Sequence, residues 1–128
     1  MEMASLREAY GKALVELGAQ NKNIVALDAD LSKSTRTALF QEAYPERFFE
    51  ISIAEQNMIG VAVGLALTGK IPFVNSFAVF ATGRTYDQIR QSACIANINI
   101  KICGSSSGLS DFGDGATHQS LEDVALMR

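Results

Sequence analysis

The spacing of apolar residues changes along the chain, and each change predicts a new element of secondary structure. From Ala4 to Leu17 apolar residues recur about every 3.6 positions, which predicts an amphipathic helix, and Gly18 follows as a stop signal. The run at 23–28 is apolar and continuous, which is typical of a parallel strand buried on both faces. Similar runs predict three further strands, at 49–53, 70–76 and 98–103. The remaining patterns predict helices at 37–43, 55–69 and 78–97, and the beginning of another at 121–128.

This order of elements predicts an α/β fold over residues 1–128, with a mostly parallel sheet between two layers of helices. Strand and helix alternate at least four times, and units of this kind are joined by right-handed crossovers. In such three-layer αβα domains the loops at the carboxyl ends of the strands carry the chemistry. Four polar loops have that position here, at 28–34, 52–55, 77–83 and 105–118.

The helix predicted over 55–69 is apolar on nearly every side, so we expect it to be buried all round. Its length of about 16 residues is that of a core helix rather than of a membrane span. Glu55 stands at its beginning, and two interpretations of this acid remain open. With Ser52 it could form a capping box, in which each side chain bonds the other's backbone N–H. Alternatively, the carboxyl group has a chemical role.

Composition narrows the class of protein. A chain of 128 residues with 48% hydrophobic and 20% charged residues is typical of one soluble globular domain. The net charge of −3 gives no basic surface for nucleic acid or for an anionic membrane. Cys94 and Cys103 lack a CxxC spacing, and we expect reduced, buried thiols in a cytoplasmic protein. The last residues, 121–128, read as a helix cut off after two turns, which indicates a fragment.

Three smaller patterns bear on chemistry. The single histidine, His118, cannot complete an ordinary zinc site with two scattered cysteines, so we expect no metal on this chain. Residues 104–108 match GxSxG, but the glycine-rich loop behind them is not the helix that a serine nucleophile elbow needs. Phe77 and Phe80 lie three apart where a strand ends, so their rings could face a flat ligand or pack in the core.

Together, the loops resemble the pyrimidine-binding domain of transketolase, a thiamine diphosphate enzyme. The matching segments follow one order along the whole chain: Arg7, DADLSKS at 28–34, IAEQNM at 53–58, FAVFATG at 77–83 and GDGATHQ at 113–119. Each segment is weak alone, but their joint order and spacing are specific. The resemblance implies a thiamine diphosphate-binding fold and the transfer of a two-carbon ketol unit between sugar phosphates.

The resemblance also implies which residues meet the cofactor. In this family a glutamate at the position of Glu55 bonds N1′ of the aminopyrimidine, which favours the tautomer that removes the thiazolium C2 proton. Glu55 and His118 are therefore the expected catalytic residues. Phe77 is expected to stack on the pyrimidine and Phe80 to line the same pocket. Asp30 matches a position close to the cofactor and to the contact between subunits.

A second group of residues is expected to bind the substrate. Arg7 and Ser34 match positions that hold the sugar phosphate, where a cation and a hydroxyl suit an anionic oxygen. Asp114 and His118 match residues that bond substrate hydroxyls. Ser106 stands where the family often has a histidine, so we expect the substrate contacts to differ there.

The resemblance places the metal and the diphosphate elsewhere. The GDG at 113–115 lies too near the end of the sequence to be followed by the asparagine that completes a metal and diphosphate motif. Mg²⁺ or Ca²⁺ is therefore expected on an N-terminal, diphosphate-binding partner subunit. Homodimerisation is also expected, and the isolated fragment is expected to be inactive.

Other functions remain open beside a transketolase. Two rivals share the fold and the glutamate: 1-deoxyxylulose-5-phosphate synthase and the β subunit of a 2-oxo-acid dehydrogenase. Arg7 and the segment 28–34 favour transketolase over both. A third rival, of another class, is a non-catalytic interaction domain.

Overall fold

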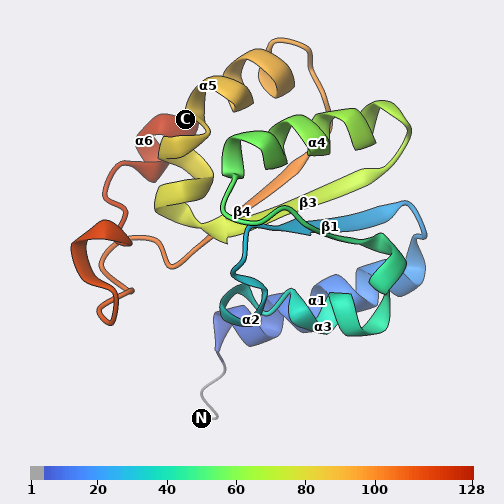
Figure 1. Cartoon of the computed structure of the whole chain (residues 1–128), viewed down its shortest axis with the longest axis horizontal. Helices are drawn as coiled ribbons and strands as arrows, with labels where there is room; N and C mark the ends of the chain where they lie inside the picture. The colour runs from blue at the N-terminus through green and yellow to red at the C-terminus, as the bar shows by residue number, and fades with distance from the viewer. Residues whose placement is uncertain (1–4) are drawn as a thin grey trace.

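Four parallel strands form one sheet with helices on both faces (Figure 1). The structure, a computed structural model, describes residues 5–128. The strands, in the sheet order β2–β1–β3–β4, are Phe48–Glu50 (β2), Ile24–Asp28 (β1), Ile71–Phe77 (β3) and Lys101–Ser105 (β4). This arrangement confirms the predicted three-layer αβα fold with a parallel sheet.

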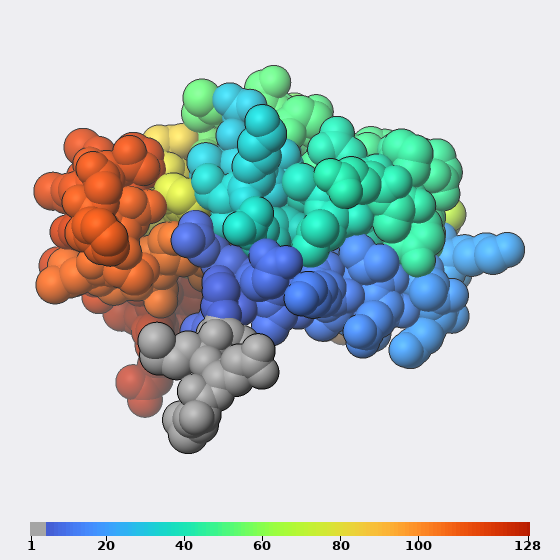
Figure 2. Space-filling view, turned by 90° about the horizontal axis from the view of Figure 1, so that it is seen from below, coloured from blue at the N-terminus to red at the C-terminus, as the bar shows by residue number. Residues whose placement is uncertain are grey.

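The helices that come before β2 in the sequence form one layer, and those that come after it form the other. The first layer contains α1 (Leu6–Gln20), α2 (Ser32–Thr35), α3 (Ala38–Ala43) and the 3₁₀ turn η1 (Pro45–Arg47). Figure 2 shows α1 beside residues 31–47 on this face of the molecule. The second layer contains α4 (Glu55–Leu67), η2 (Val79–Arg84), α5 (Tyr86–Gln88), η3 (Ile89–Cys94) and α6 (Asp123–Met127). A last 3₁₀ turn, η4 (Gly115–Thr117), lies in the loop after β4.

A hydrophobic core lies on each side of the sheet. Successive residues of a strand point to opposite faces. Val25 and Leu27 of β1 therefore enter the core beneath α4, whereas Ile24 and Ala26 enter the core against α1 and α3. All of β1 is buried, as the continuous apolar run predicts.

The end of α1 differs from the prediction. The helix continues through Gly18 to Gln20, and Ala4, where we expected it to begin, lies outside the described residues. Gly18 has a packing role instead: a Cβ at this position would come within 2.7 Å of a ring carbon of Phe40. A residue that looks like a stop signal in the sequence is therefore a point of close contact between α1 and α3.

Helix α4 is not buried on all sides, so this part of the prediction was wrong. Met58, Ile59 and Ala62 are buried, but Leu67 is 71% exposed. Apart from the adjacent residues and the backbone of α4 itself, no atom of the described residues lies within 4 Å of where a Cβ would stand at Gly60 or Gly64. The sequence pattern shows that this face is apolar, but it cannot show which atoms cover it.

The stretch 78–97 is not one regular helix. Two π-helical segments, η2 and η3, flank the single turn α5, and the helical part ends at Cys94. The hydroxyl of Thr82 donates to the carbonyl oxygen of Ala78, four residues earlier, at 2.7 Å. Bonds of this kind bend helices. Cys94 is exposed and Cys103 is half-buried, so the expectation of two buried thiols was also wrong.

Candidate functional site

The loops that were expected to carry the chemistry meet at the carboxyl edge of the sheet. Strands β1, β3 and β4 end there, and α4 begins at the same edge with Glu55 (Figure 1). The loop 106–120 also lies at this end of the molecule. Parallel strands align their carboxyl ends, so segments far apart in the sequence are brought together here.

Glu55 is almost fully buried, with 1% of its surface exposed. Its Oε2 accepts a hydrogen bond from Nη1 of Arg84 at 2.8 Å, which makes the two side chains an ion pair. The capping box is not formed: the N–H of Ser52 donates to Oε1 of Glu50 at 2.9 Å, and α4 has Ala54 as its N-cap without a side-chain bond. The capping interpretation of Glu55 is therefore wrong, and its carboxyl group pairs with Arg84 through one oxygen instead.

Three aromatic rings pack together beside this ion pair. The ring centroids of Phe77 and Phe80 are 6.4 Å apart, with 16° between the ring planes. The ring of His118 packs edge-on against both, with centroids 6.0 and 5.1 Å away. The guanidinium carbon of Arg84 lies 4.4 Å from the centroid of Phe80. Glu55, Arg84 and the three rings thus form one continuous set of contacts, which we call the Glu55 cluster.

Sequence reasoning did not find Arg84. It follows Phe80 by four residues, a spacing that can put two side chains on one helix face, and this signal could have indicated the contact. The carbonyl oxygen of Arg84 also accepts a hydrogen bond from Nε2 of Gln56 at 3.0 Å. The beginning of α4 and the end of η2 are therefore tied by both side-chain and backbone contacts.

The loop after β1 is organised by Asp28, which is completely buried. Its Oδ2 accepts hydrogen bonds from the hydroxyls of Thr35 at 2.7 Å and Thr37 at 2.8 Å. Its Oδ1 accepts a bond from the N–H of Leu31 at 2.7 Å. Burial raises the pKa of Asp28, and these three bonds act against that shift. The carboxyl group therefore holds the shape of the loop that carries Asp30 and Ser34.

A second acid, Glu50, holds two loops at the edge of the site. Its Oε1 accepts hydrogen bonds from the N–H groups of Asp30 at 2.8 Å and Ser52 at 2.9 Å. Both residues have left-handed backbones, with φ of 62° and 59°. Such angles are unfavourable for residues other than glycine, so the two bonds support a backbone that the sequence alone does not favour. The turn at Ser52 also explains why β2 ends at Glu50 and not at the predicted Ile53.

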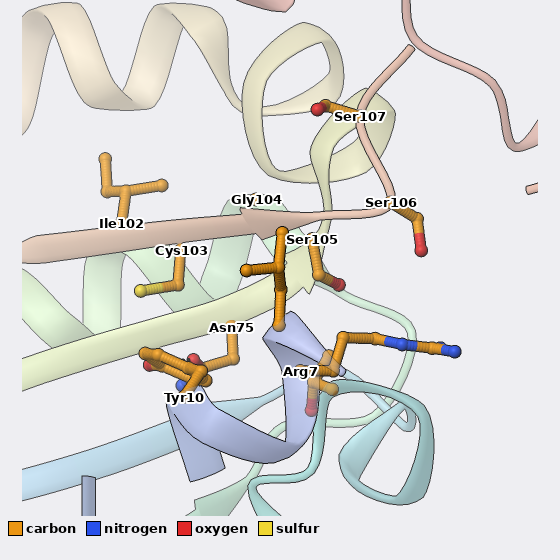
Figure 3. A pocket seen from close by; sticks show the side chains of 11 residues that line it. Arg7, Tyr10, Asn75, Ile102, Cys103, Gly104, Ser105, Ser106 and Ser107 are labelled. Carbon is orange, nitrogen blue, oxygen red and sulfur yellow. Dashed lines mark hydrogen bonds between the residues drawn. The ribbon is translucent and has the colours of Figure 1, made fainter. Parts of the chain in front are cut away.

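A cavity of about 430 Å³ opens between α1 and the sheet (Figure 3). Its lining consists of Leu6, Arg7, Tyr10, Thr35, Asn75 and residues 102–107. The hydroxyl of Tyr10 donates to Oδ1 of Asn75 at 2.5 Å, and burial raises the pKa of both Tyr10 and Cys103. The side chain of Arg7 extends away from Tyr10 and Asn75 (Figure 3), and its Nη1 donates to the carbonyl oxygen of Ser34 at 3.1 Å.

Most of the expected site residues therefore lie at one of two positions. The Glu55 cluster holds the expected catalytic and aromatic residues, namely Glu55, Phe77, Phe80 and His118. Three of the expected substrate-binding residues lie around the cavity, where Arg7 and Ser106 line it and the carbonyl oxygen of Ser34 accepts a bond from Arg7. Asp30 and Asp114 are exposed on their loops.

Two further findings concern what residues 5–128 contain. No helix in this part of the chain is both long and apolar enough to cross a membrane. Within the same described residues, His, Cys, Asp and Glu side chains do not gather in any group of three that could hold a metal ion.

Comparison of the sequence with known proteins identifies a family. Residues 2–128 match the family described as transketolase, pyrimidine binding domain. A protein of Methanocaldococcus jannaschii, named as the C-terminal section of a transketolase, is 51% identical over 123 residues, which are 96% of this chain and 39% of that protein. A 6-deoxy-6-sulfo-D-fructose transketolase subunit of a Clostridium species is 45% identical over 123 residues, covering 96% and 38% of the two chains.

A solved structure leads to the same family. A split-gene transketolase, described as an inactive β4 tetramer, has a TM-score of 0.81 and 59% identity, covering 95% of this chain and 39% of that one. The chain thus spans about two fifths of the length of these relatives. Because the family match runs through every strand and loop described above, the chain belongs to the transketolase family, as its pyrimidine-binding domain.

Proposed function

We propose that this chain forms the pyrimidine-binding half of a transketolase active site, which transfers a two-carbon ketol unit between sugar phosphates with thiamine diphosphate. The buried carboxyl group of Glu55 beside aromatic rings is the observation that carries this proposal. Burying an ionisable group is unfavourable, and the ion pair with Arg84 satisfies only Oε2 of Glu55 among the described residues. A role of Oε1 toward a ligand accounts for the other half of the carboxyl group.

The Glu55 cluster fits the aminopyrimidine end of the cofactor. Oε2 of Glu55 is bonded to Arg84, whereas no described residue bonds Oε1, which can carry the proton that it shares with a ring nitrogen. Phe80 is half-buried and Phe77 is 4% exposed, so Phe80 supplies most of the accessible flat apolar surface on which a heterocycle packs. A hydrogen bond in so dry a place is strong, because water does not compete for it.

Each residue of the cluster then has a distinct task. Thiamine diphosphate, when bound, supplies the carbanion-stabilising chemistry that ketol transfer requires. Glu55 holds a proton between its Oε1 and N1′ of the pyrimidine. Phe77 stacks on that ring, Phe80 lines the same pocket, and Asp30 lies near the cofactor and the subunit contact. His118, beside both phenylalanines, bonds a substrate hydroxyl near the reacting carbon.

The other end of the substrate belongs at the cavity beside α1. Arg7, Ser34 and Ser106 hold its anionic group, and Asp114 bonds a hydroxyl closer to the reacting carbon. The Clostridium relative is named for a sulfonated sugar, which carries a sulfonate in place of a phosphate. Both kinds of anionic sugar are therefore substrates to test.

A second subunit completes the enzyme in this proposal. It binds the diphosphate and Mg²⁺ or Ca²⁺, and the assembly contains at least two copies of each chain in the cytoplasm. The M. jannaschii relative, named as a C-terminal section, supports a division into two chains. The inactive β4 tetramer of the split-gene relative supports the expectation that this chain is inactive alone.

The test is ketol transfer by the assembled enzyme. The full protein containing this domain is mixed with its diphosphate-binding partner, thiamine diphosphate and Mg²⁺, and transfer from xylulose 5-phosphate to ribose 5-phosphate is measured. We expect Glu55→Gln to lower turnover about a hundredfold or more, as is typical of general acid–base groups. The matched control is Glu42→Gln, at an exposed glutamate of α3.

Three results would overturn the proposal. Use of pyruvate alone would favour 1-deoxyxylulose-5-phosphate synthase or a 2-oxo-acid dehydrogenase β subunit. Normal turnover in Glu55→Gln would remove the acid from the mechanism. Activity of the partner that does not depend on this chain would favour a non-catalytic interaction domain.

A further inference from the structure

We propose that Arg84 is a positioning residue, which anchors one oxygen of Glu55 so that the other is presented to the cofactor. This inference rests on the proposed function, because it concerns how Glu55 meets the pyrimidine. Its first support is the bond itself: Nη1 of Arg84 lies 2.8 Å from Oε2 of Glu55, the length of a charge-assisted hydrogen bond.

The two partners differ in burial, and this difference sets their roles. The side chain of Glu55 is 2% exposed, whereas that of Arg84 is 43% exposed. The carboxylate would lie unpaired in an apolar setting without the arginine, and an unpaired buried charge is strongly unfavourable. Rotation of the carboxyl group would lose the bond, so the arginine restricts Glu55 to one orientation.

Arg84 is itself held in place on two sides. Its guanidinium group lies over the ring of Phe80, 4.4 Å from the centroid. Its carbonyl oxygen accepts the bond from Gln56, the residue that follows Glu55 in α4. A planar guanidinium can stack on a ring and donate to a carboxylate at once, whereas the ammonium group of lysine is a point charge without that plane.

The consequence is a division of labour between the two oxygens of Glu55. Oε2 is occupied by the arginine, and Oε1 is left with no donor among the described residues. A ring nitrogen therefore meets one oxygen at one place. Catalysis depends steeply on such placement, since an error of about 1 Å in a reacting group can lower the rate about a hundredfold.

A double-mutant cycle in the assembled enzyme tests this proposal. The variants are Arg84→Met, Glu55→Gln and the pair, and the two readouts are the Kd for thiamine diphosphate, from calorimetry with Mg²⁺, and turnover at saturating cofactor. We expect Arg84→Met alone to raise the Kd several-fold and to lower turnover about tenfold or more. In the Glu55→Gln background the same substitution should change both quantities less than about twofold, because its effect passes through the carboxylate.

Two further variants separate positioning from folding. Arg84→Lys keeps the charge and should recover part of the lost turnover. Arg90→Met, at an exposed arginine in the same helical stretch, should match the wild type in both readouts. Thermal unfolding of each variant shows whether the fold is kept, and Arg84→Lys carries the cycle if Arg84→Met does not fold.

The failures of the two proposals can be told apart. If Arg84→Met changes the Kd and turnover by the same factors in both backgrounds, or changes neither, Arg84 does not act through Glu55 and the positioning role is wrong. If Glu55→Gln itself leaves the Kd and turnover at wild-type values, or if the assembly does not bind thiamine diphosphate, the proposed function is wrong.

Discussion

Replacing Asp28 by alanine is the most direct test of how the site loop is held. The substitution removes the acceptor of three hydrogen bonds, from the hydroxyls of Thr35 and Thr37 and from the N–H of Leu31. All three bonds lie at a completely buried side chain. We therefore expect Asp28→Ala to lower the free energy of unfolding and to loosen the loop 29–37.

The size of the loss follows from the unpaired donors. Each buried donor left without a partner costs about 1–3 kcal/mol. Removal of a buried carboxylate recovers part of this, so we expect a net loss of about 3 kcal/mol. In a domain of this size that corresponds to a fall in Tm of about 10 °C.

The pH dependence has a definite sign. Burial raises the pKa of Asp28 above its ordinary value of 3.8, so the folded chain binds this proton at a higher pH than the unfolded chain does. As the pH falls through the folded pKa toward 3.8, the contribution of Asp28 to stability therefore increases. Asp28→Asn cannot titrate. Relative to this variant, the wild type should gain stability as the pH is lowered from 7 to 4.5.

Urea unfolding followed by circular dichroism measures both effects. The matched control is Asp87→Ala, at an exposed aspartate of α5, where we expect a change below about 0.5 kcal/mol. A loss below about 1 kcal/mol in Asp28→Ala would refute the argument from unpaired donors. A constant difference between the wild type and Asp28→Asn over this pH range would refute the argument from burial.

Three further predictions concern other contacts. Glu50→Ala removes the acceptor shared by two loop N–H groups and should lower the free energy of unfolding by about 1–2 kcal/mol. The control Glu42→Ala should leave the free energy of unfolding unchanged, and equal urea midpoints for the two variants would contradict the prediction. Above pH 10 the half-buried Tyr10 keeps a proton that the unfolded chain releases, so stability should fall by up to about 1.4 kcal/mol per pH unit. Tyr10→Phe should reduce that slope, and an unchanged slope would show that Tyr10 is not its source. Gly11→Ala should lower the Tm, because the new Cβ would lie 2.6 Å from the carbonyl oxygen of Arg36, and this clash outweighs the better helix propensity of alanine. A raised Tm would show that α1 can move aside.

The fold could be predicted because its signals are local and repeated. The continuous apolar runs at 23–28 and 70–76 appear as the central strands β1 and β3, and the order of elements dictates a parallel sheet. The position of Glu55 followed in the same way, since a strand, a turn and an apolar helix put one acid at the carboxyl edge. The grouping of Phe77, Phe80 and His118 then depends only on loops that meet at that edge.

The contacts that hold the site could not be predicted, because they join residues far apart in the sequence. Arg84 bonds an acid 29 residues earlier, and its spacing from Phe80 indicates only the ring contact, not the bond to Glu55. The capping box failed for a similar reason: a competing acceptor, Glu50, takes the N–H of Ser52. The exposure of one face of α4 was not predicted, because the spacing of apolar residues does not show which parts of the protein pack against them.

The π-helical turn of η2 has a consequence for how this family can vary in length. A π bulge accommodates an extra residue within a helix. We expect loss of one residue between Phe80 and Arg84 to restore a regular helix there. The same deletion should rotate the arginine away from the acid. We therefore expect a homologue with one residue fewer in this turn to lack the ion pair, even where it keeps an arginine nearby.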